Sequence, residues 1–543
     1  MKNHYLLYLA AVILFQVINL ETQAQAPDFA WAKRAGGTDG DAASRMAVDA
    51  SGNSYVTGIF RGIASFGTAN LTSSGSTDVF IAKYDASGNV LWAKQAGGQD
   101  IDASKNIAVD ISGDSYITGE FQGSATFGST TLTSSGSYDA FIAKYDASGN
   151  VLWAKQSGGA GLEMGRGIAV DGSGNCYITG YFDGSATFGS TTLTSSGSYD
   201  VFIAKYDATG NFQWADRAGS SGEDYGRNVA IDGSGNSYIA GTFRNLASFG
   251  STTLTSSGVE DIFIAKYDAS GSVLWAKKAG GTSKDAANGI AVDGSGNSYI
   301  TGEFQGNTTF GSITITSSTS LPDICVARYD GSGNLLWVKQ AGGSSSDFGR
   351  NITVDGSGNS YITGEFEGSA SFGSTMLTSS GGVDIFIASY DASGNVLWAK
   401  RAGGTLEDRA SGVELDGSGN TYISGYFLGQ ASFDSTTITS SGASDIYIAK
   451  LGTVTGLPNI SGFHLSTYPN PFAISLTVCL TTPDPATATL TDLLGRQVHR
   501  QVIFPEAAGA AATLTPAHNL PSGAYLLRVQ QGNTVRVVRV LRE

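Results

Sequence analysis

Residues 261–277 read DIFIAKYDASGSVLWAK: a run of aromatic and β-branched residues, a turn, and a second apolar run that contains Trp275. This tryptophan is one of seven, and neighbouring members of the set lie 61 or 62 residues apart: Trp31, Trp92, Trp153, Trp214, Trp275, Trp337 and Trp398. A fixed spacing of one rare residue marks a structural unit that is repeated along the chain. We therefore expect seven copies of one unit to form most of this 543-residue protein.

Each unit contains four short runs that are typical of β-strands. Residues 289–293 and 298–304 flank a Gly-Ser-Gly-Asn turn, and residues 261–267 and 273–277 flank an Asp-Ala-Ser-Gly turn. Four antiparallel strands per unit indicate a propeller blade. The sequence thus predicts an all-β fold, a seven-bladed β-propeller with four-stranded blades over residues 25–452. An open solenoid is the alternative, but it would need an atypical polar cap at each end.

The two ends of the repeat region predict how the ring closes. The region begins with a lone fourth strand, residues 29–33, and its last unit stops after a third strand, residues 445–450. We expect the N-terminal strand to complete the seventh blade, because pairing there removes both free sheet edges. In the alternative assignment of strands to blades, the Trp strand is the innermost strand of its blade. Each blade is then one continuous stretch of sequence, and the N-terminal strand is not needed for closure. The long connection after each Trp strand favours the first assignment.

The repeat resembles a known family. Residues 289–302, GIAVDGSGNSYITG, together with the stretch around Trp275, are similar to the SBBP (seven-bladed beta-propeller) repeats of exported bacterial proteins, and more distantly to NHL propellers. The resemblance covers residues 28–452 and implies the propeller fold. It implies no particular activity, because propellers carry many unrelated functions.

The N-terminus predicts export. Lys2 precedes an apolar run, residues 5–20, and a small-residue site, residues 22–26, which together are typical of a secretory signal. We expect a signal peptide over residues 1–24, cut after Ala24. The apolar run is short for a membrane span, so we expect no transmembrane segment in the mature chain. Three cysteines cannot all pair, and Cys176 and Cys325 are interpreted as small buried residues.

After a linker, residues 453–462, the period ends and a second domain is expected over residues 463–543. Its short strands and its Pro and Gly residues predict a small C-terminal β-sandwich. Its motif residues are Pro469, Asn470, Pro471, Asp492, Gly495, Arg496, Gly523 and Tyr525. In order, they resemble the type A C-terminal sorting domain of the type IX secretion system of Bacteroidetes. The resemblance implies that the secretion machinery is a partner, and that the chain is released outside the cell or attached to its surface.

Charge and histidine placement exclude two classes of function. Residues 25–452 hold 42 acidic and 25 basic side chains, so they would repel a nucleic-acid backbone. The histidines are His4, His464, His499 and His518, all outside the repeats. A His-dependent triad or a His-ligated metal site in the ring is thereby excluded.

Carboxylates are the remaining candidates for chemistry. An acid follows each Trp by ten residues: Asp41, Asp102, Glu163, Asp224, Asp285, Asp347 and Asp408. Another acid opens each third strand: Asp78, Asp139, Asp200, Asp261, Asp323, Asp384 and Asp445. Both sets should lie on the face of the long loops. The first set is our candidate for calcium, although no cofactor is required. The structural alternative, in which the acids accept loop N–H bonds between blades, fits their presence in all seven copies better.

The repeats contain two further acidic patterns. The Asp-x-Ser-Gly-Asn turns lack the ligand spacing of an EF-hand, so they are interpreted as side-chain-stabilised turns. Glu120, Glu303 and Glu365 end second strands near the long-loop face, where a pair at suitable separation would support glycoside hydrolysis.

The leading hypothesis for function is a secreted or cell-surface propeller that performs no catalysis. It would bind polysaccharide or a surface protein through the long loops, residues 123–137 and their six counterparts. The alternative is a carboxylate-dependent polysaccharide-degrading enzyme. A third interpretation makes these loops extra edge strands without a ligand.

Overall fold

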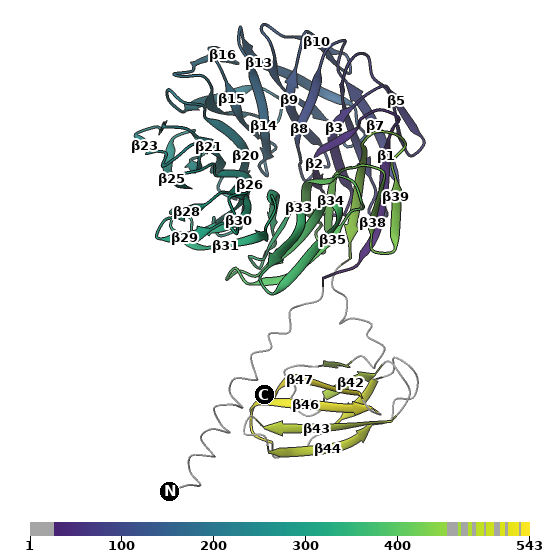
Figure 1. Cartoon of the computed structure of the whole chain (residues 1–543). Coiled ribbons are helices and arrows are strands. Elements are labelled where there is room, and N and C mark those ends of the chain that lie inside the picture. Colours follow the sequence, from purple (N-terminus) through teal and green to yellow (C-terminus); the bar gives the residue numbers. More distant parts are fainter. Residues whose placement is uncertain are drawn as a thin grey trace. The chain divides into compact units, whose positions relative to one another are not determined.

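The computed structural model describes residues 26–452 and, after them, residues 465–468, 476–480, 485–492, 496–503, 511–515, 520–531 and 534–542. The predicted signal peptide, the predicted linker, Pro469 to Pro471 and Gly495 lie outside the described residues. The chain divides into two compact units, Met1–Val454 and Thr455–Glu543. Every regular element described in either unit is a β-strand (Figure 1).

The first unit consists of sets of four antiparallel strands, and each set is hydrogen-bonded in the order first, second, third and fourth strand. Set 1 is β2 (Ala42–Val48), β3 (Ser54–Phe60), β6 (Asp78–Tyr84) and β7 (Val90–Ala96). Set 2 is β8 (Asp102–Val109), β9 (Ser115–Phe121), β12 (Asp139–Tyr145) and β13 (Val151–Gly159). Set 3 is β14 (Glu163–Val170), β15 (Cys176–Phe182), β18 (Asp200–Tyr206) and β19 (Phe212–Ala218). Set 4 is β20 (Tyr225–Ile231), β21 (Ser237–Phe243), β24 (Asp261–Tyr267) and β25 (Val273–Gly281).

The remaining sets follow the same order. Set 5 is β26 (Ala286–Val292), β27 (Ser298–Phe304), β30 (Asp323–Tyr329) and β31 (Leu335–Gly343). Set 6 is β32 (Phe348–Val354), β33 (Ser360–Phe372), β34 (Thr375–Tyr390) and β35 (Val396–Ala402). Set 7 combines β36 (Asp408–Leu415), β37 (Thr421–Phe427) and β40 (Asp445–Leu451) with the N-terminal strand β1 (Phe29–Gly37). The sets curve around a centre that the first strands face, as β2, β8, β14, β20 and β26 show in Figure 1.

The N-terminal strand pairs with the last strand of the unit. Antiparallel partners run from Trp31 opposite Lys450 to Ala35 opposite Ile446, and the N–H of Gly452 donates to the carbonyl of Asp28 at 3.0 Å. Phe29 also packs in the same buried cluster as Trp398 of set 6. The strand predicted at residues 29–33 therefore lies beside the predicted third strand at residues 445–450.

The long loops form hairpins: β4 (Ile63–Phe66) with β5 (Ala69–Thr72), β10 (Ser124–Phe127) with β11 (Thr130–Thr133), β16 (Ser185–Phe188) with β17 (Thr191–Thr194), β22 (Leu246–Phe249) with β23 (Thr252–Thr255), β28 (Asn307–Phe310) with β29 (Ile313–Thr316), and β38 (Gln430–Phe433) with β39 (Thr436–Thr439). In set 6 the facing ends of β33 and β34 play this part. Each hairpin bonds to the fourth strand of the preceding set, as β16 does to β13. Each set is thereby linked to the one before it.

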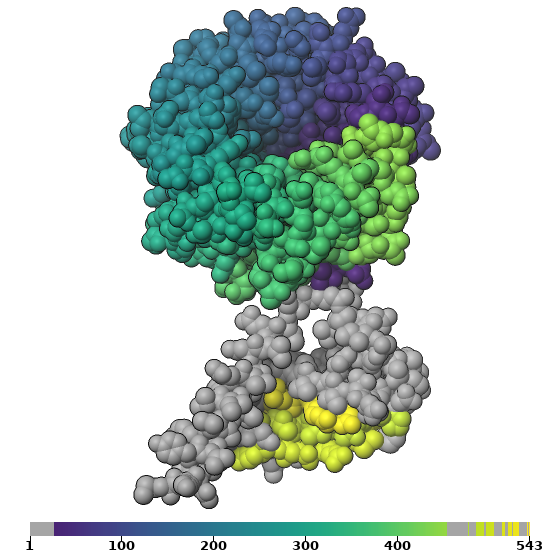
Figure 2. Space-filling model, viewed as in Figure 1, coloured from purple at the N-terminus to yellow at the C-terminus, as the bar shows by residue number. Residues whose placement is uncertain are grey.

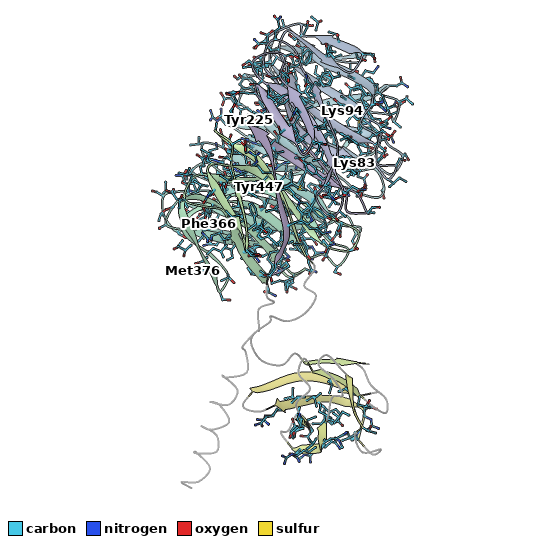
Figure 3. All side chains as sticks on the ribbon, turned by 90° about the vertical axis from the view of Figure 1, so that its right-hand side faces the viewer. Lys83, Lys94, Tyr225, Phe366, Met376 and Tyr447 are labelled. Atoms are coloured by element: carbon cyan, nitrogen blue, oxygen red, sulfur yellow. The ribbon has the colours of Figure 1, made fainter. Side chains whose placement is uncertain are left out.

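Aromatic and aliphatic side chains fill the space between neighbouring sets. One buried cluster joins Tyr55 and Ile81 of set 1 to Ile117 and Phe141 of set 2, and similar clusters follow around the unit. In Figure 3 Tyr447 and Phe366, both fully buried, lie inside the unit, whereas the exposed Met376 lies at its periphery. Cys176 and Cys325 are buried free thiols, as the sequence indicates.

The second unit contains two antiparallel sheets. One has β41 (Leu465–Tyr468), β42 (Leu476–Leu480) and β45 (Ala511–Leu514). The other runs in the order β44 (Gln497–Ile503), β43 (Ala486–Asp492), β46 (Gly523–Gln531) and β47 (Thr534–Arg542). A single buried cluster contains Leu476 and Leu514 of the first sheet and Leu490 and Leu527 of the second.

Candidate functional site

The two predicted sets of acids meet in pairs between neighbouring strand sets. Asp78 begins the third strand of set 1, Asp102 begins the first strand of set 2, and both side chains are fully buried. Asp102 accepts a hydrogen bond from the N–H of Gly98 at 2.6 Å, and Asp78 accepts one from the N–H of Ser74 at 2.8 Å. The corresponding members of every pair are likewise 0–1 % exposed.

A glycine separates the two carboxyl groups of the pair. A Cβ atom on Gly97 would lie 2.8 Å from Cγ of Asp78 and 2.9 Å from Oδ2 of Asp102, and its φ of +147° also favours glycine. Both acids can therefore approach the same short stretch of backbone. The residues equivalent to Gly97 beside Asp445, Asp200, Asp323 and Asp384 are glycines in the same geometry: Gly36, Gly219, Gly342 and Gly403.

Burial raises the pKa of these acids. Desolvation is the largest cause, and the neighbouring carboxylate adds to it, while backbone N–H donors act in the opposite direction. The pKa rises to about 6 for Asp41 and Asp285, to about 7 for Asp102, Asp224, Asp347 and Asp408, and to about 8 for Glu163. In the third-strand partners, such as Asp78 and Asp200, desolvation also raises the pKa.

This geometry is that of the structural alternative, in which the acids hold loop backbone between sets. The first-set carboxylates each accept the N–H of the residue four positions earlier, as Asp224 does from Ser220 and Asp347 from Gly343. Among the described residues, no group of three or more His, Cys, Asp or Glu side chains is arranged to hold a metal ion. The proposed calcium role of these acids stays a prediction.

The Asp-x-Ser-Gly-Asn turns are stabilised by their own side chains. Oδ1 of Asp85 accepts the N–H groups of Ser87 and Asn89 at 2.9 and 2.8 Å, and Oδ2 accepts the side-chain amide of Asn89. These bonds lower the pKa of Asp85, the backbone bond from Asn89 being the largest cause. The indole N–H of Trp31 donates to the carbonyl of Ala86 in this turn at 3.2 Å, so the turn also joins set 1 to set 7.

The long-loop hairpins expose hydroxyl groups. In β10–β11 the side chains of Ser124, Thr126, Thr131 and Thr133 are exposed, whereas Ala125 and Leu132 face the interior. The hydroxyls of Thr126 and Thr131 lie 3.1 Å apart across the hairpin. Equivalent cross-strand pairs occur in other sets, for example Thr187 with Thr192. Strand alternation therefore gives each hairpin one buried face and one polar face.

The residues that face the centre of the ring are not among the candidates predicted from the sequence. Each first strand carries a bulge close to the long-loop face, and the extra residue there differs between sets: Ser44, Lys105, Arg166, Arg227, Asn288, Arg350 and Ser411. They line a cavity of about 280 Å³ together with Arg45 and Ala410, and no carboxylate is among its lining residues. We call this cavity the channel mouth. Figure 2 shows the depression at the middle of the unit.

Arg45 lies between the channel mouth and the rest of the central channel. Its guanidinium donates to the carbonyls of Ser411, Arg350 and Asn288, the last two at 3.1 and 3.3 Å. Burial, followed by the neighbouring charge of Arg350, lowers the pKa of Arg45 to about 10. Beyond it, a second cavity of about 340 Å³ is lined mainly by small aliphatic side chains. Glu414 lines that cavity, and burial raises its pKa to about 7.

A comparison of the repeats with one another could have found these residues. The unit is nearly identical from copy to copy along most of its length, but the bulge column contains Ser, Lys, Arg and Asn. Arg45 stands where Asn106, Asn228 and Asn351 stand in three other sets, and Glu414 stands where five sets have Ala and one has Thr353. Differences within an otherwise uniform repeat are the signal that was missed.

The glutamates considered for glycoside hydrolysis lie beside the channel mouth and are held by other side chains. Glu120 pairs with Lys105 at 2.8 Å, Glu303 accepts a bond from the amide of Asn288, and Glu365 pairs with both Arg350 and Arg409. Each second strand that carries one of them is hydrogen-bonded to the first strand of its set. These carboxylates therefore counter part of the positive charge of the mouth.

In the second unit the described motif residues hold a hairpin and a strand end. Oδ2 of Asp492 and Nε of Arg496 lie 2.7 Å apart, and Oδ1 of Asp492 accepts the N–H of Arg496. These bonds close the turn between β43 and β44. The hydroxyl of Tyr525 donates to the carbonyl of Pro521 at 2.7 Å, just before β46, in which Gly523 is the first residue.

Two family models match the chain. The SBBP model, described as a beta-propeller repeat, matches residues 91–120, 152–184, 213–242, 274–303 and 336–365. The model of the secretion system C-terminal sorting domain matches residues 466–542. The chain carries SBBP repeats and a sorting tail. It is thus marked for export, with attachment to the cell surface or secretion, and the tail implies interaction with the type IX secretion machinery. No helix that could span a membrane is present among the described residues.

Curated relatives are distant and longer. An uncharacterized WD repeat-containing protein of Acanthamoeba polyphaga mimivirus is 26 % identical over 73 % of this chain and 36 % of its own length. The regulatory protein FlaEY of Caulobacter vibrioides is 25 % identical over 59 % of this chain and 35 % of its own length. The chain spans about a third of each. Among solved structures, PorZ of Porphyromonas gingivalis, a surface component of its type IX secretion system, is 14 % identical with a TM-score of 0.38, over 92 % of this chain and 59 % of PorZ.

Proposed function

We propose that the protein is an exported, non-catalytic seven-bladed β-propeller, followed by a β-sandwich tail, that binds a polysaccharide through its long-loop face. In this proposal each four-strand set is one blade, the N-terminal strand completes the seventh, residues 25–452 form the propeller and residues 463–543 the tail. The pairing of β1 with β40 supports the ring closure.

The observation that carries the binding proposal is the repeated hairpin on the long-loop face. Each hairpin presents hydroxyls on a rigid two-stranded element, as β10–β11 does with Ser124, Thr126, Thr131 and Thr133. A polysaccharide offers many equivalent hydroxyl groups along its length. Several weak contacts made by one rigid ring to one polymer add up to useful retention, since every contact after the first is intramolecular.

The engagement of the acids supports a non-catalytic role. A glycoside hydrolase needs an acid and a second carboxylate that reach the same bond. Here the first-strand acids accept backbone N–H bonds within the protein, and Glu120 and Glu365 are paired with cations. A reducing-sugar assay on a polysaccharide panel tests this part of the proposal, with no sustained release of product as the expected result.

Retention on immobilised polysaccharides tests the binding itself. The first variant replaces Thr126 and Thr131 of one hairpin by Val. The second variant also replaces the equivalent pair, Thr187 and Thr192, by Val. Retention should fall in the first variant and fall further in the second, without a change in melting temperature. The control is Leu152→Thr, which changes an exposed residue on the fourth strand of set 2. It should leave retention unchanged. Retention that is indifferent to both hairpin variants would contradict binding by this face.

A further inference from the structure

On one side of the channel mouth, sets 3 and 4 place charged and aromatic side chains next to one another. Arg166 and Arg227 are the bulge residues of sets 3 and 4, and both line the mouth. Beside them stand Tyr181 of β15 and Tyr225 of β20, at positions where other sets have Glu120 and Ala103. Charge and aromatic surface therefore occur together here. The guanidinium of Arg350 also lies 4.8 Å from the ring of Phe348 in set 6, but Arg350 is paired with Glu365.

The aromatic part is a compact cluster of three half-buried rings. The ring centroids of Tyr181 and Tyr225 are 4.8 Å apart, those of Tyr181 and Tyr199 5.5 Å, and those of Tyr199 and Tyr225 5.8 Å. Figure 3 marks Tyr225 within the unit. The carbons of an aromatic ring are an apolar surface, and here the protein holds both phenolic oxygens: Tyr225 donates to Glu223 at 3.2 Å, and Tyr181 accepts from Arg166. A surface of this kind fits the face of a sugar ring, which has C–H groups surrounded by hydroxyls.

The cationic part is directly adjacent. The guanidinium of Arg166 lies 5.4 Å from the ring centroid of Tyr181 and donates to its hydroxyl at 2.9 Å. The guanidinium of Arg227 lies 5.8 Å from the ring of Tyr225. Arg227 is the important member, because its Nε is buried without a hydrogen-bond partner and no described residue forms an ion pair with it.

The other charged groups around the mouth are already matched. Glu120 forms an ion pair with Lys105, and Glu365 forms ion pairs with Arg350 and Arg409. On the long-loop side, Glu223 and Glu260 both form ion pairs with Arg244. Arg45 is occupied by backbone carbonyls. An unmatched guanidinium in a cavity with no carboxylate among its lining residues is a site for an anion, which guanidinium binds by charge-assisted hydrogen bonds.

We propose that the channel mouth binds one anionic sugar unit of a polysaccharide, with its acidic group against Arg227 and Arg166 and its ring against Tyr181 and Tyr225. This inference rests on the proposed polysaccharide-binding function. It adds that the polysaccharide is negatively charged and that it binds at a second site, distinct from the hairpins. A sulfate ester and a uronate carboxylate share the required chemistry, and the experiment distinguishes them.

Binding of the full mature chain to three soluble polymers tests the inference: chondroitin sulfate, polygalacturonate and neutral dextran. We expect a measurable Kd for at least one of the two anionic polymers and much weaker binding to dextran. Arg227→Gln should weaken anionic binding about tenfold, since a hydrogen bond to a charged group is lost. Tyr225→Ala should weaken it further. Because Arg227 has no ion pair among the described residues, its replacement should leave the melting temperature unchanged.

Lys155→Gln removes the same charge from the exposed face of an outer strand and is the matched control. If it weakens binding as much as Arg227→Gln does, the effect is one of net charge and the site is refuted. If neutral and anionic polymers bind equally and Arg227→Gln changes neither, the inference fails while polysaccharide binding stands. If none of the three polymers binds, both fail. If an anionic polymer does bind, competition by inorganic sulfate or by free galacturonate identifies which anion the channel mouth prefers.

Discussion

At the scale of single residues, the tryptophans recur because each one joins two neighbouring strand sets. The indole N–H donates to a turn carbonyl of the next set at 3.0–3.3 Å in six cases, as from Trp337 to Ala392 at 3.0 Å. Within the described residues Trp398 has no such bond, because set 7 has Pro27 to Phe29 where other sets have that turn. A marker chosen from the sequence for its spacing thus has a physical role.

This difference gives a matched pair of variants. Trp337→Phe should destabilise the protein more than Trp398→Phe, by about 1 kcal/mol, because both changes remove similar ring area but only the first removes a hydrogen bond to the next set. Urea unfolding monitored by circular dichroism measures the difference. Equal losses would show that the indole bond contributes nothing to the joint.

The buried carboxyl pairs make stability depend on pH. Their folded pKa values, about 6 to about 8 for the first-strand acids, lie above the unfolded values of 3.8 for Asp and 4.5 for Glu. Their contribution to stability is therefore fully present below the unfolded pKa and is lost as the pH rises through the folded pKa. We expect the melting temperature to fall from about pH 4 to about pH 8 and to level off above that range.

The triple variant Asp102→Asn, Asp224→Asn, Asp347→Asn should show a shallower fall, because its side chains are uncharged at every pH. Calcium provides the contrasting experiment at pH 8. A rise in melting temperature with millimolar calcium in the parent chain, absent in the triple variant, would support the cation role of these acids. A melting temperature that rises with pH in the absence of metal would contradict the pKa argument.

Sequence reasoning located these acids and the loop N–H bonds that they accept, but not their pairing. Asp41 and its counterparts could be found by spacing from the Trp residues, and the turn role of Asp85 follows from its Asn partner four residues later. The pairing of Asp78 with Asp102 depends on how two strand sets pack, and so does the convergence of Tyr181 and Tyr225. Local patterns identify residues of one strand, whereas sites between strand sets require the three-dimensional arrangement.

At the scale of elements, the strands follow their sequence patterns closely. Residues predicted at 261–267 and 298–304 coincide with β24 and β27, because alternating aromatic and β-branched residues bounded by Gly and Asp are strong strand signals. The sequence allows two interpretations of the long loops, as binding loops or as extra edge strands. In the structure they form two-stranded hairpins. That they bond to the preceding set could not be predicted, since such pairing joins segments far apart in sequence.

The N-terminal strand offers a test of this long-range pairing. Deleting residues 25–36 should lower stability by several kcal/mol, because β40 loses its partner and the buried cluster that contains Trp398 loses Phe29. A synthetic peptide of residues 26–37 added to the truncated chain should restore much of the loss, whereas a peptide with Phe29 and Ala32 replaced by Asp should not. A truncated chain that melts at the temperature of the parent would contradict closure by this strand.

At the scale of the whole molecule, the repeat unit and the tail have separate tasks. The sorting-domain match covers residues 466–542, and the described core of the second unit contains only residues of that segment. We expect a chain that ends at Gly456 to fold, as judged by its melting temperature, but to remain in the periplasm. Cell fractionation and immunoblotting measure this. Normal amounts of the shortened chain in the medium or on the surface would contradict dependence on the tail.

The pairing of β1 with β40 also sets the order of events when the chain folds. Trp31 lies opposite Lys450, a residue more than four hundred positions later in the chain. Strand β1 is therefore synthesised early but can pair only after β40, the last strand of the first unit, has been made. Sets 1 to 6 can form early from local contacts, whereas set 7 is completed only by joining the two ends. Contacts of such long sequence separation form slowly and leave an exposed strand edge in the meantime. Refolding should therefore end in a slow phase, during which the nearly complete ring is most open to aggregation and proteolysis.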